Sequence, residues 1–154
     1  MRPTTIARLL RGYLDADYRW ELDGSWHHLR VGEPAPDAES SFPDATRFGL
    51  VTAWNPQSVK RAERENKAAD EALHFWLANS GLAFRPAFAS AQDRGWREPG
   101  WLVAGMPVET FDALGLRFGQ LATLWWQRGE PVRLRMQAHC PDSCGDDAHV
   151  DWLK

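Results

Sequence analysis

Two segments of this sequence are apolar on both faces of an extended strand, and they limit the folds open to the chain more than any other feature. Arg47–Trp54 (RFGLVTAW) places large apolar side chains such as Leu50 and Val51 on opposite faces, and Trp101–Gly105 (WLVAG) is a second short apolar run. A strand with two apolar faces is typical of a sheet interior that is covered on both sides. Both segments are therefore predicted to be inner strands.

The order of elements around these two strands predicts the fold. A helix is expected from Ser58 to about Asn79, because Ser58 can cap it and Ser80-Gly81 can end it. The remaining elements are a strand at Leu82–Ser90, a helix from Pro107 to Phe118, a strand at Leu121–Trp126 and an appended strand at Pro131–Gln137. Pro86 lacks a ladder donor, which favours an edge position for its strand. The order predicts an α+β fold, a ferredoxin-like split β-α-β two-layer sandwich with an extra C-terminal strand.

The flanking segments complete a single predicted domain over residues 1–154. Residues 1–31 are expected to form a short amphipathic helix and a β-hairpin, with Asp23-Gly24 at the turn. Residues 32–46 are rich in Pro, Asp, Ser and Ala and predict a mobile loop. The α+β core is expected over 47–137, and residues 138–154 are expected to be an irregular tail.

Composition and charge exclude several classes of function. The chain has a formal net charge of −3, so no overall attraction to nucleic acid or anionic lipid is predicted. No apolar run is long enough to span a membrane and the N-terminus does not resemble a signal peptide, so a cytoplasmic location is expected. The two cysteines are too few for a disulfide framework. The nine tryptophans are interpreted first as core material.

Polar residues from distant parts of the chain are predicted to meet at one end of this sheet. In the predicted topology, the first strand ends where the third and fourth strands begin, which brings Asn55, Glu98 and Gln120 together. The long helix starts at the same place and adds the cation Arg61. Asn66 falls within the apolar stripe of that helix and needs a hydrogen-bond partner. These groups suit a small ligand or an anion, but they can equally serve only to cap strand ends and satisfy Asn66.

Four motifs resemble a bacterial family catalogued as domain of unknown function 3293. They are FGLVTAWNP at Phe48–Pro56, RENKAADEAL with Asn66, WREPGWLVAG with Glu98, and FGQLATLWW at Phe118–Trp126. The resemblance covers roughly residues 48 to 126, and the recurring polar positions of the family correspond to Asn55, Asn66, Glu98 and Gln120. Trp101 departs from the pattern, where a smaller polar residue is more usual. The resemblance supports the choice of residues and implies no activity.

Three functions remain open from the sequence. The favoured hypothesis is a binding or regulatory module that holds a small polar or anionic ligand at the Asn55/Glu98/Gln120 edge, with Trp54 or Trp96 as a stacking wall. Arg61 and Arg97 would then pair with the charge of the ligand. The second hypothesis is an enzyme with Glu98 as general acid or base. The third is a protein-interaction module, or a homodimer, that uses an exposed tryptophan of the hairpin.

The C-terminal tail carries a weak candidate for a metal site. His139, Cys140, Cys144 and His149 offer four nitrogen and sulfur ligands for tetrahedral zinc, but their spacing matches no standard finger. A flexible tail with reduced or locally paired thiols is the simpler interpretation. No cofactor is otherwise expected.

Overall fold

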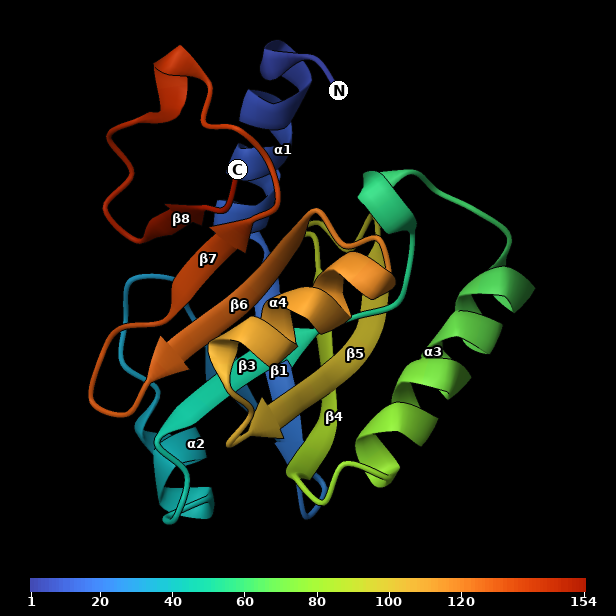
Figure 1. Ribbon diagram of the computed structural model, residues 1–154, viewed down its shortest axis with the longest axis vertical. Coiled ribbons are helices and arrows are strands. Elements are labelled where there is room, and N and C mark those ends of the chain that lie inside the picture. Colours follow the sequence, from blue (N-terminus) through green and yellow to red (C-terminus); the bar gives the residue numbers. More distant parts are fainter.

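A computed structural model describes residues 1–154 and contains four α-helices packed on a curled sheet of eight strands (Figure 1). The strands are β1 (Asp17–Leu22), β2 (Ser25–Leu29), β3 (Arg47–Val51), β4 (Ala83–Ser90), β5 (Arg97–Ala104), β6 (Ala122–Gln127), β7 (Arg133–Met136) and β8 (Val150–Trp152). The helices are α1 (Pro3–Asp15), α2 (Pro36–Ser41), α3 (Glu63–Ala78) and α4 (Val108–Arg117). The prediction of a mixed helix and sheet fold is confirmed.

The two strands predicted to be inner are inner strands. The sheet order is β2-β1-β4-β5-β3-β6-β7-β8, so β3 lies between β5 and β6, and β5 lies between β4 and β3. All three of the pairings β3–β5, β3–β6 and β4–β5 are antiparallel. The ends of β3 and β4 and the beginnings of β5 and β6 consequently lie at the same end of the sheet.

The prediction that the Pro86 strand lies at an edge is wrong. The N-terminal hairpin extends the main sheet, because β1 pairs antiparallel with β4 over Asp17–Trp20 and Ala87–Ser90. Pro86 is tolerated in this inner strand because the pairing with β1 stops at Ala87, one residue away. The hairpin turn itself is as expected, with positive φ values at Asp23 and Gly24.

The sheet curls until its two sides nearly meet. Val31, just after β2, forms an isolated parallel bridge with Val132, just before β7. Two backbone hydrogen bonds seal this junction, from Gly32 N to Val132 O at 2.8 Å and from Val132 N to Glu33 O at 2.9 Å. The larger of two hydrophobic clusters fills the inside of the curl, with Trp20, Phe48 and Trp126 fully buried in it.

Helices α3 and α4 cover the other face of the sheet (Figure 1). The smaller hydrophobic cluster lies there and includes Leu73 and Leu77 of α3 and Phe111 of α4. Helix α4 packs very closely on β3, since a Cβ atom added to Gly49 would lie 2.4 Å from Cε1 of Phe111. A glycine in the centre of the strand is therefore required by the approach of α4.

Two segments predicted to be irregular contain regular structure. Residues 32–46 include α2, where Ala38 is completely buried and the guanidinium of Arg128 binds the backbone oxygens of Glu39, Phe42 and Ala45. The segment was expected to have little to bury, but Ala35 and Ala38 are both buried in the larger hydrophobic cluster.

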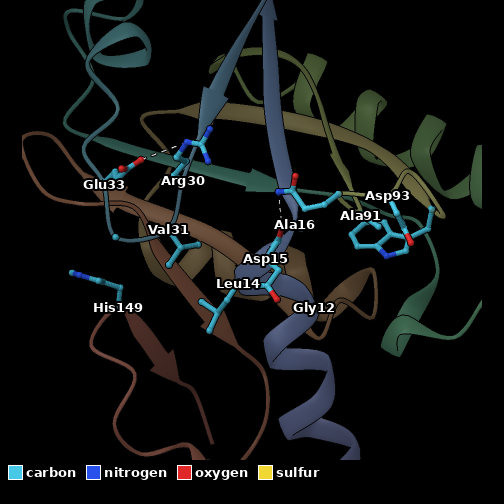
Figure 2. Close-up of a pocket in the computed structure, with 13 residues that line it drawn as sticks. Gly12, Leu14, Asp15, Ala16, Arg30, Val31, Glu33, Ala91, Asp93 and His149 are labelled. Atoms are coloured by element: carbon cyan, nitrogen blue, oxygen red, sulfur yellow. Dashed lines mark hydrogen bonds and ion pairs between the residues drawn. The ribbon is translucent and has the colours of Figure 1, made fainter.

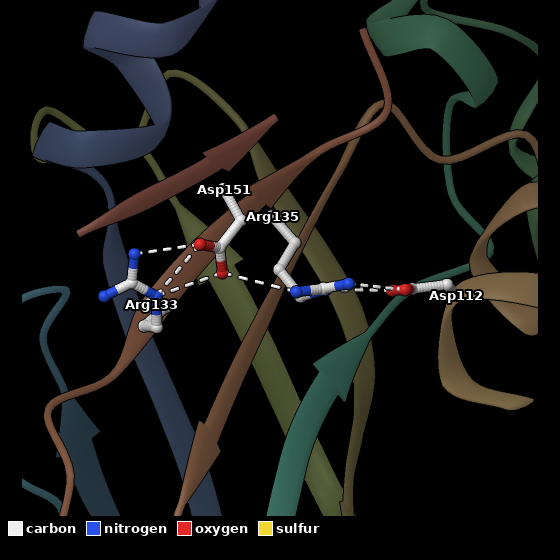
Figure 3. A network of polar contacts seen from close by, with 4 residues as sticks. All are labelled: Asp112, Arg133, Arg135 and Asp151. Atoms are coloured by element: carbon white, nitrogen blue, oxygen red, sulfur yellow. Dashed lines mark hydrogen bonds and ion pairs between the residues drawn. The ribbon is translucent and has the colours of Figure 1, made fainter. Parts of the chain in front are cut away.

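The C-terminal tail also differs from the predicted irregular structure. It forms a short 3₁₀ helix at Asp142–Cys144 and the strand β8, which runs parallel to β7. A chain of ion pairs fixes this end (Figure 3): Asp151 of β8 binds Arg133 and Arg135 of β7, and Arg135 also binds Asp112 of α4. Ion pairs of Asp151 thus help to hold the tail against β7, although its low apolar content predicted an irregular structure.

Helix α1 lies at the end of the sheet where β3 and β4 end, and it contacts three segments there. Arg11 pairs with Asp147 of the tail, Tyr13 contacts Ser58 after β3, and Gln92 after β4 donates to the backbone oxygen of Asp15. Its apolar side is buried through Ile6 and Leu10. None of the helices is both long and apolar enough to cross a membrane.

Candidate functional site

The segment between β3 and α3 has an unusual backbone. Three of its four residues from Asn55 to Ser58 have left-handed φ values, +46° at Asn55, +56° at Gln57 and +59° at Ser58. Helix α3 therefore begins only at Glu63, and the prediction that Ser58 caps it is wrong. Such conformations cost on the order of 1 kcal/mol or more each for residues other than glycine, so other contacts must hold this loop in place.

Asn66 provides those contacts from the first turn of α3. Its Oδ1 accepts hydrogen bonds from the backbone N–H of Asn55 at 2.8 Å and from Nε of Arg61 at 2.7 Å. Its Nδ2 donates to Oδ1 of Asn55 at 2.9 Å. Asn66 is only 2% exposed, so the polar side chain in the apolar stripe of the helix has the partner that it requires.

Glu98, at the start of β5, joins this cluster through one oxygen. Asn55 Nδ2 donates to Glu98 Oε1 at 3.0 Å, and no basic side chain forms an ion pair with Glu98. Burial raises the pKa of the Glu98 carboxyl, and the hydrogen bond from Asn55 offsets part of that rise. The prediction that Asn55 and Glu98 lie close together agrees with the structure.

Two hydroxyl groups complete the cluster, and sequence reasoning missed both. The Tyr13 hydroxyl of α1 contacts the Ser58 hydroxyl. Burial raises the pKa of Tyr13 to about 12, with a smaller contribution from the negative charge of Glu98. The sequence held no signal for Tyr13, because it lies on the apolar side of a helix that looked like a cover for the core. Ser58 was noticed only as a helix cap.

Gln120 and Arg97 each line a cavity at this site and also contact other parts of the protein. Gln120 is buried, and its Nε2 donates to the backbone oxygens of Trp54 and Phe118, both at 3.1 Å, so it fastens the end of β3 to the start of β6. The Arg97 guanidinium lies 4.0 Å from the centre of the Phe88 ring. Neighbouring residues of a strand point to opposite faces, so Arg97 turns away from Glu98.

These residues line two connected spaces. The outer pocket has a volume of about 560 Å³ and is lined by Trp54 and Trp96, by Glu63 and Glu98, and by the cations Arg8, Lys60, Arg61 and Arg97. The inner cavity, of about 40 Å³, reaches toward the inside of the curled sheet and is lined by Tyr18, Thr52 and Gln120 among others. Tyr13, Asn55, Ser58, Trp96 and Glu98 line both spaces. Glu98 therefore lies where the outer pocket meets the inner cavity.

A wider groove lies on the other side of Trp96 (Figure 2). Its volume is about 820 Å³, and it runs from the end of α1 to the segment that follows β2. Asp15 and Asp93 lie toward one side, and Arg30, Glu33 and His149 toward the other. Gly12 and Trp96 separate this groove from the outer pocket. Its carboxylates are exposed, whereas Glu98 is partly buried.

The zinc candidates of the tail are not gathered into a metal site. Cys140 and Cys144 are free thiols, the first exposed and the second buried. The His149 ring packs on Gly32, with Cδ2 3.0 Å from the position of an added Cβ. Nowhere in the chain do three His, Cys, Asp or Glu side chains come together as a group that could hold a metal ion.

Comparisons with known proteins match one segment of the chain. No curated protein and no solved structure was found to match the chain. One family model does match, and its matched segment contributes Asn55, Asn66, Glu98 and Gln120 to the site. The resemblance predicted from the motifs is confirmed for this part of the chain: residues 51–123 match the family described as "Protein of unknown function (DUF3293)".

Proposed function

We propose that this chain is a small-molecule binding module, and that its ligand is a polar or anionic molecule held in the outer pocket under α1. The observation that carries the proposal is the outer pocket itself, where a partly buried carboxylate, two indole rings and unpaired cations converge. Its volume of about 560 Å³ falls within the usual range for pockets that bind small ligands.

The charges of the outer pocket support an anionic group on the ligand. Four of its lining residues are cations and two are carboxylates. Neither Arg8 nor Lys60 takes part in any ion pair. A phosphate or carboxylate at the mouth would gain charge-assisted hydrogen bonds from these two side chains. Trp54 and Trp96 offer flat apolar walls for the rest of the ligand.

The strained loop is a second line of support. Left-handed residues other than glycine are found preferentially at binding and catalytic sites, where the surrounding structure compensates their cost. Here the compensation comes from Asn66, Asn55 and Arg61, and the result is that Ser58 is held against Tyr13 at the pocket wall. A loop with no role in binding could lower this cost by an ordinary helical entry into α3.

Part of this proposal concerns the architecture that carries the site. The antiparallel strand order β4-β5-β3-β6, with α3 between β3 and β4 and α4 between β5 and β6, supports a ferredoxin-like split β-α-β unit. Strands β7 and β8, added beside β6, and the hairpin β1–β2, added beside β4, then extend that unit into the curled sheet. In such a unit, the site lies where β3 ends beside the start of β5.

A second candidate function, catalysis by Glu98, is favoured by one observation. The carboxyl has a raised pKa through burial and lies in the same cavity as the hydroxyls of Tyr13 and Ser58, a setting suited to a general acid or base. Any turnover detected with a bound ligand should then be lost in Glu98→Gln while the fold is retained. Unchanged turnover in that variant would leave binding as the function.

A screen of metabolites tests the proposed binding. Wild-type protein and a double variant, Arg8→Ala with Lys60→Ala, are compared by thermal shift and by isothermal titration with each hit. The matched control is Arg64→Ala, an exposed arginine of α3 that does not line the outer pocket. We expect an anionic hit whose affinity falls at least tenfold in the double variant and stays unchanged in the control. Hits that bind the wild type and the double variant equally well would contradict the proposal.

A further inference from the structure

The hydrogen-bonding groups of the outer pocket divide into those already used by the protein and those left free. Asn55 Oδ1 accepts bonds from the backbone N–H of Arg61 at 3.2 Å and from Asn66, and Asn66 Oδ1 also accepts two bonds. Arg61 is committed through Nε to Asn66 and through its terminal nitrogen to the backbone oxygen of Ala53 at 3.0 Å. The acceptor oxygens of Asn55 and Asn66 are therefore used within the wall, while Arg61 keeps further N–H donors that bind no protein group.

Glu98 is the exception among them. Its Oε1 accepts one bond from the neutral amide of Asn55, and its Oε2 accepts none. Arg97, its neighbour in sequence, lies over the Phe88 ring, and Arg61, which lines the same outer pocket, binds Asn66. Partial burial makes a carboxylate without a cationic partner less favourable than a paired one. A cation or a strong donor would complete the hydrogen bonding of Glu98.

The space beside Glu98 limits the size of that partner. The inner cavity has a volume of about 40 Å³, which is room for only about three water-sized groups at roughly 10–15 Å³ each. Its lining combines apolar side chains such as Leu50 and Leu124 with polar ones, among them Thr52 and the hydroxyl-bearing Tyr13 and Ser58. A group with one heavy atom and several donors, such as a primary ammonium, fits both the space and the acceptors. Trp96 adds an aromatic wall that also attracts a cation.

We propose that Glu98 receives the primary ammonium group of a zwitterionic ligand whose anionic group binds Arg8 and Lys60 at the mouth of the outer pocket. This inference rests on the proposed binding function and names the chemical class of its ligand. The ammonium enters the inner cavity first, the body of the ligand lies between Trp54 and Trp96, and the phosphate or carboxylate remains at the mouth. The two ends of the ligand thus meet the two unpaired kinds of charge in the same pocket.

Simple probes test this directly at pH 7.5, where the amines are cationic. The wild-type protein is titrated with 2-aminoethyl phosphate, ethyl phosphate and ethylammonium, and binding is followed by NMR at the indole N–H groups of Trp54 and Trp96. β-Alanine and propionate repeat the comparison with a carboxylate in place of the phosphate. Trp101 does not line either space and serves as the internal reference. We expect the zwitterions to bind at least tenfold more tightly than the probes that are charged at one end only.

Two variants connect the effect to the residues. Glu98→Gln keeps the acceptor for Asn55 and loses the charge, so we expect it to remove the advantage of the zwitterions and to leave the binding of ethyl phosphate unchanged. Lys60→Ala should weaken both phosphates, and Arg64→Ala should weaken neither. If ethyl phosphate binds and the amine adds nothing, or if Glu98→Gln keeps the full advantage, the inference is overturned while the binding function stands. If no probe shifts either indole, both are overturned.

Discussion

Replacing Asn66 by alanine should remove much of the stability of this fold, and the structure gives the size of the effect. The side chain is 2% exposed and makes three hydrogen bonds, two to Asn55 and one from the charged guanidinium of Arg61. Net contributions of about 1 kcal/mol for each neutral bond and about 2 kcal/mol for the charged one give a loss of about 4 kcal/mol in the free energy of unfolding. Folded domains have about 5–15 kcal/mol in total.

Urea unfolding followed by tryptophan fluorescence measures this loss, since the midpoint falls in proportion to the stability if the slope is unchanged. The matched control is Asn79→Ala on the same helix, because Asn79 is exposed and its Nδ2 donates only to the backbone oxygen of Phe75. We expect the control to lose less than about 1 kcal/mol. An Asn66→Ala variant as stable as the control would refute the reasoning, because it would show that the left-handed loop needs no support from α3.

Three further variants test other features of the structure. Glu98→Gln removes a carboxyl whose pKa is raised by burial. In the wild type, protonated Glu98 contributes stability that is present below the ordinary glutamate pKa and is lost as the pH rises through the folded-state pKa. Over that pH interval, the thermal unfolding temperature of Glu98→Gln should therefore rise relative to that of the wild type. Unfolding temperatures of the two proteins that change in parallel with pH would contradict this. Gly49→Ala should lower the free energy of unfolding by about 1–3 kcal/mol or more in the same urea assay, because the new Cβ collides with the buried ring of Phe111. Gly12→Ala in α1, where an added Cβ meets nothing, should instead raise it by about 0.5–1 kcal/mol, and equal losses at both glycines would be evidence against the close packing.

The parts of the fold that local patterns could predict are those where local and long-range preferences agree. Strands β3 and β5 were predicted as inner strands because side chains on both of their faces are apolar, and burial on both faces is the only environment that suits them. Pro86 misled the prediction, because its effect depends on which residues of a neighbouring strand pair with it. The pairing between β1 and β4 stops at Ala87, one residue after Pro86, and no pattern in the sequence reports that register.

The candidate site was predicted in its residues more accurately than in their roles. Asn55 and Glu98 do meet, because the order of the strands determines which strand ends lie together. The contribution of Tyr13 could not be predicted, because it depends on where α1 packs on the finished sheet. The role of Asn66 was also open, since a buried amide can bind a ligand or the protein, and only the distances to Asn55 and Arg61 distinguish the two.

The way charges are paired elsewhere in this protein strengthens the case for a ligand at Glu98. In the network of Figure 3, Arg133, Asp151, Arg135 and Asp112 alternate in sign, and each charge has an opposite partner. Within this network the partly buried charges neutralise one another. At the outer pocket, Glu98 and the four lining cations form no ion pair, although they line the same space. Separated opposite charges that do not pair with each other can both be compensated by one molecule that carries the two complementary charges at its ends. The comparison of zwitterionic probes with probes charged at one end only measures this property.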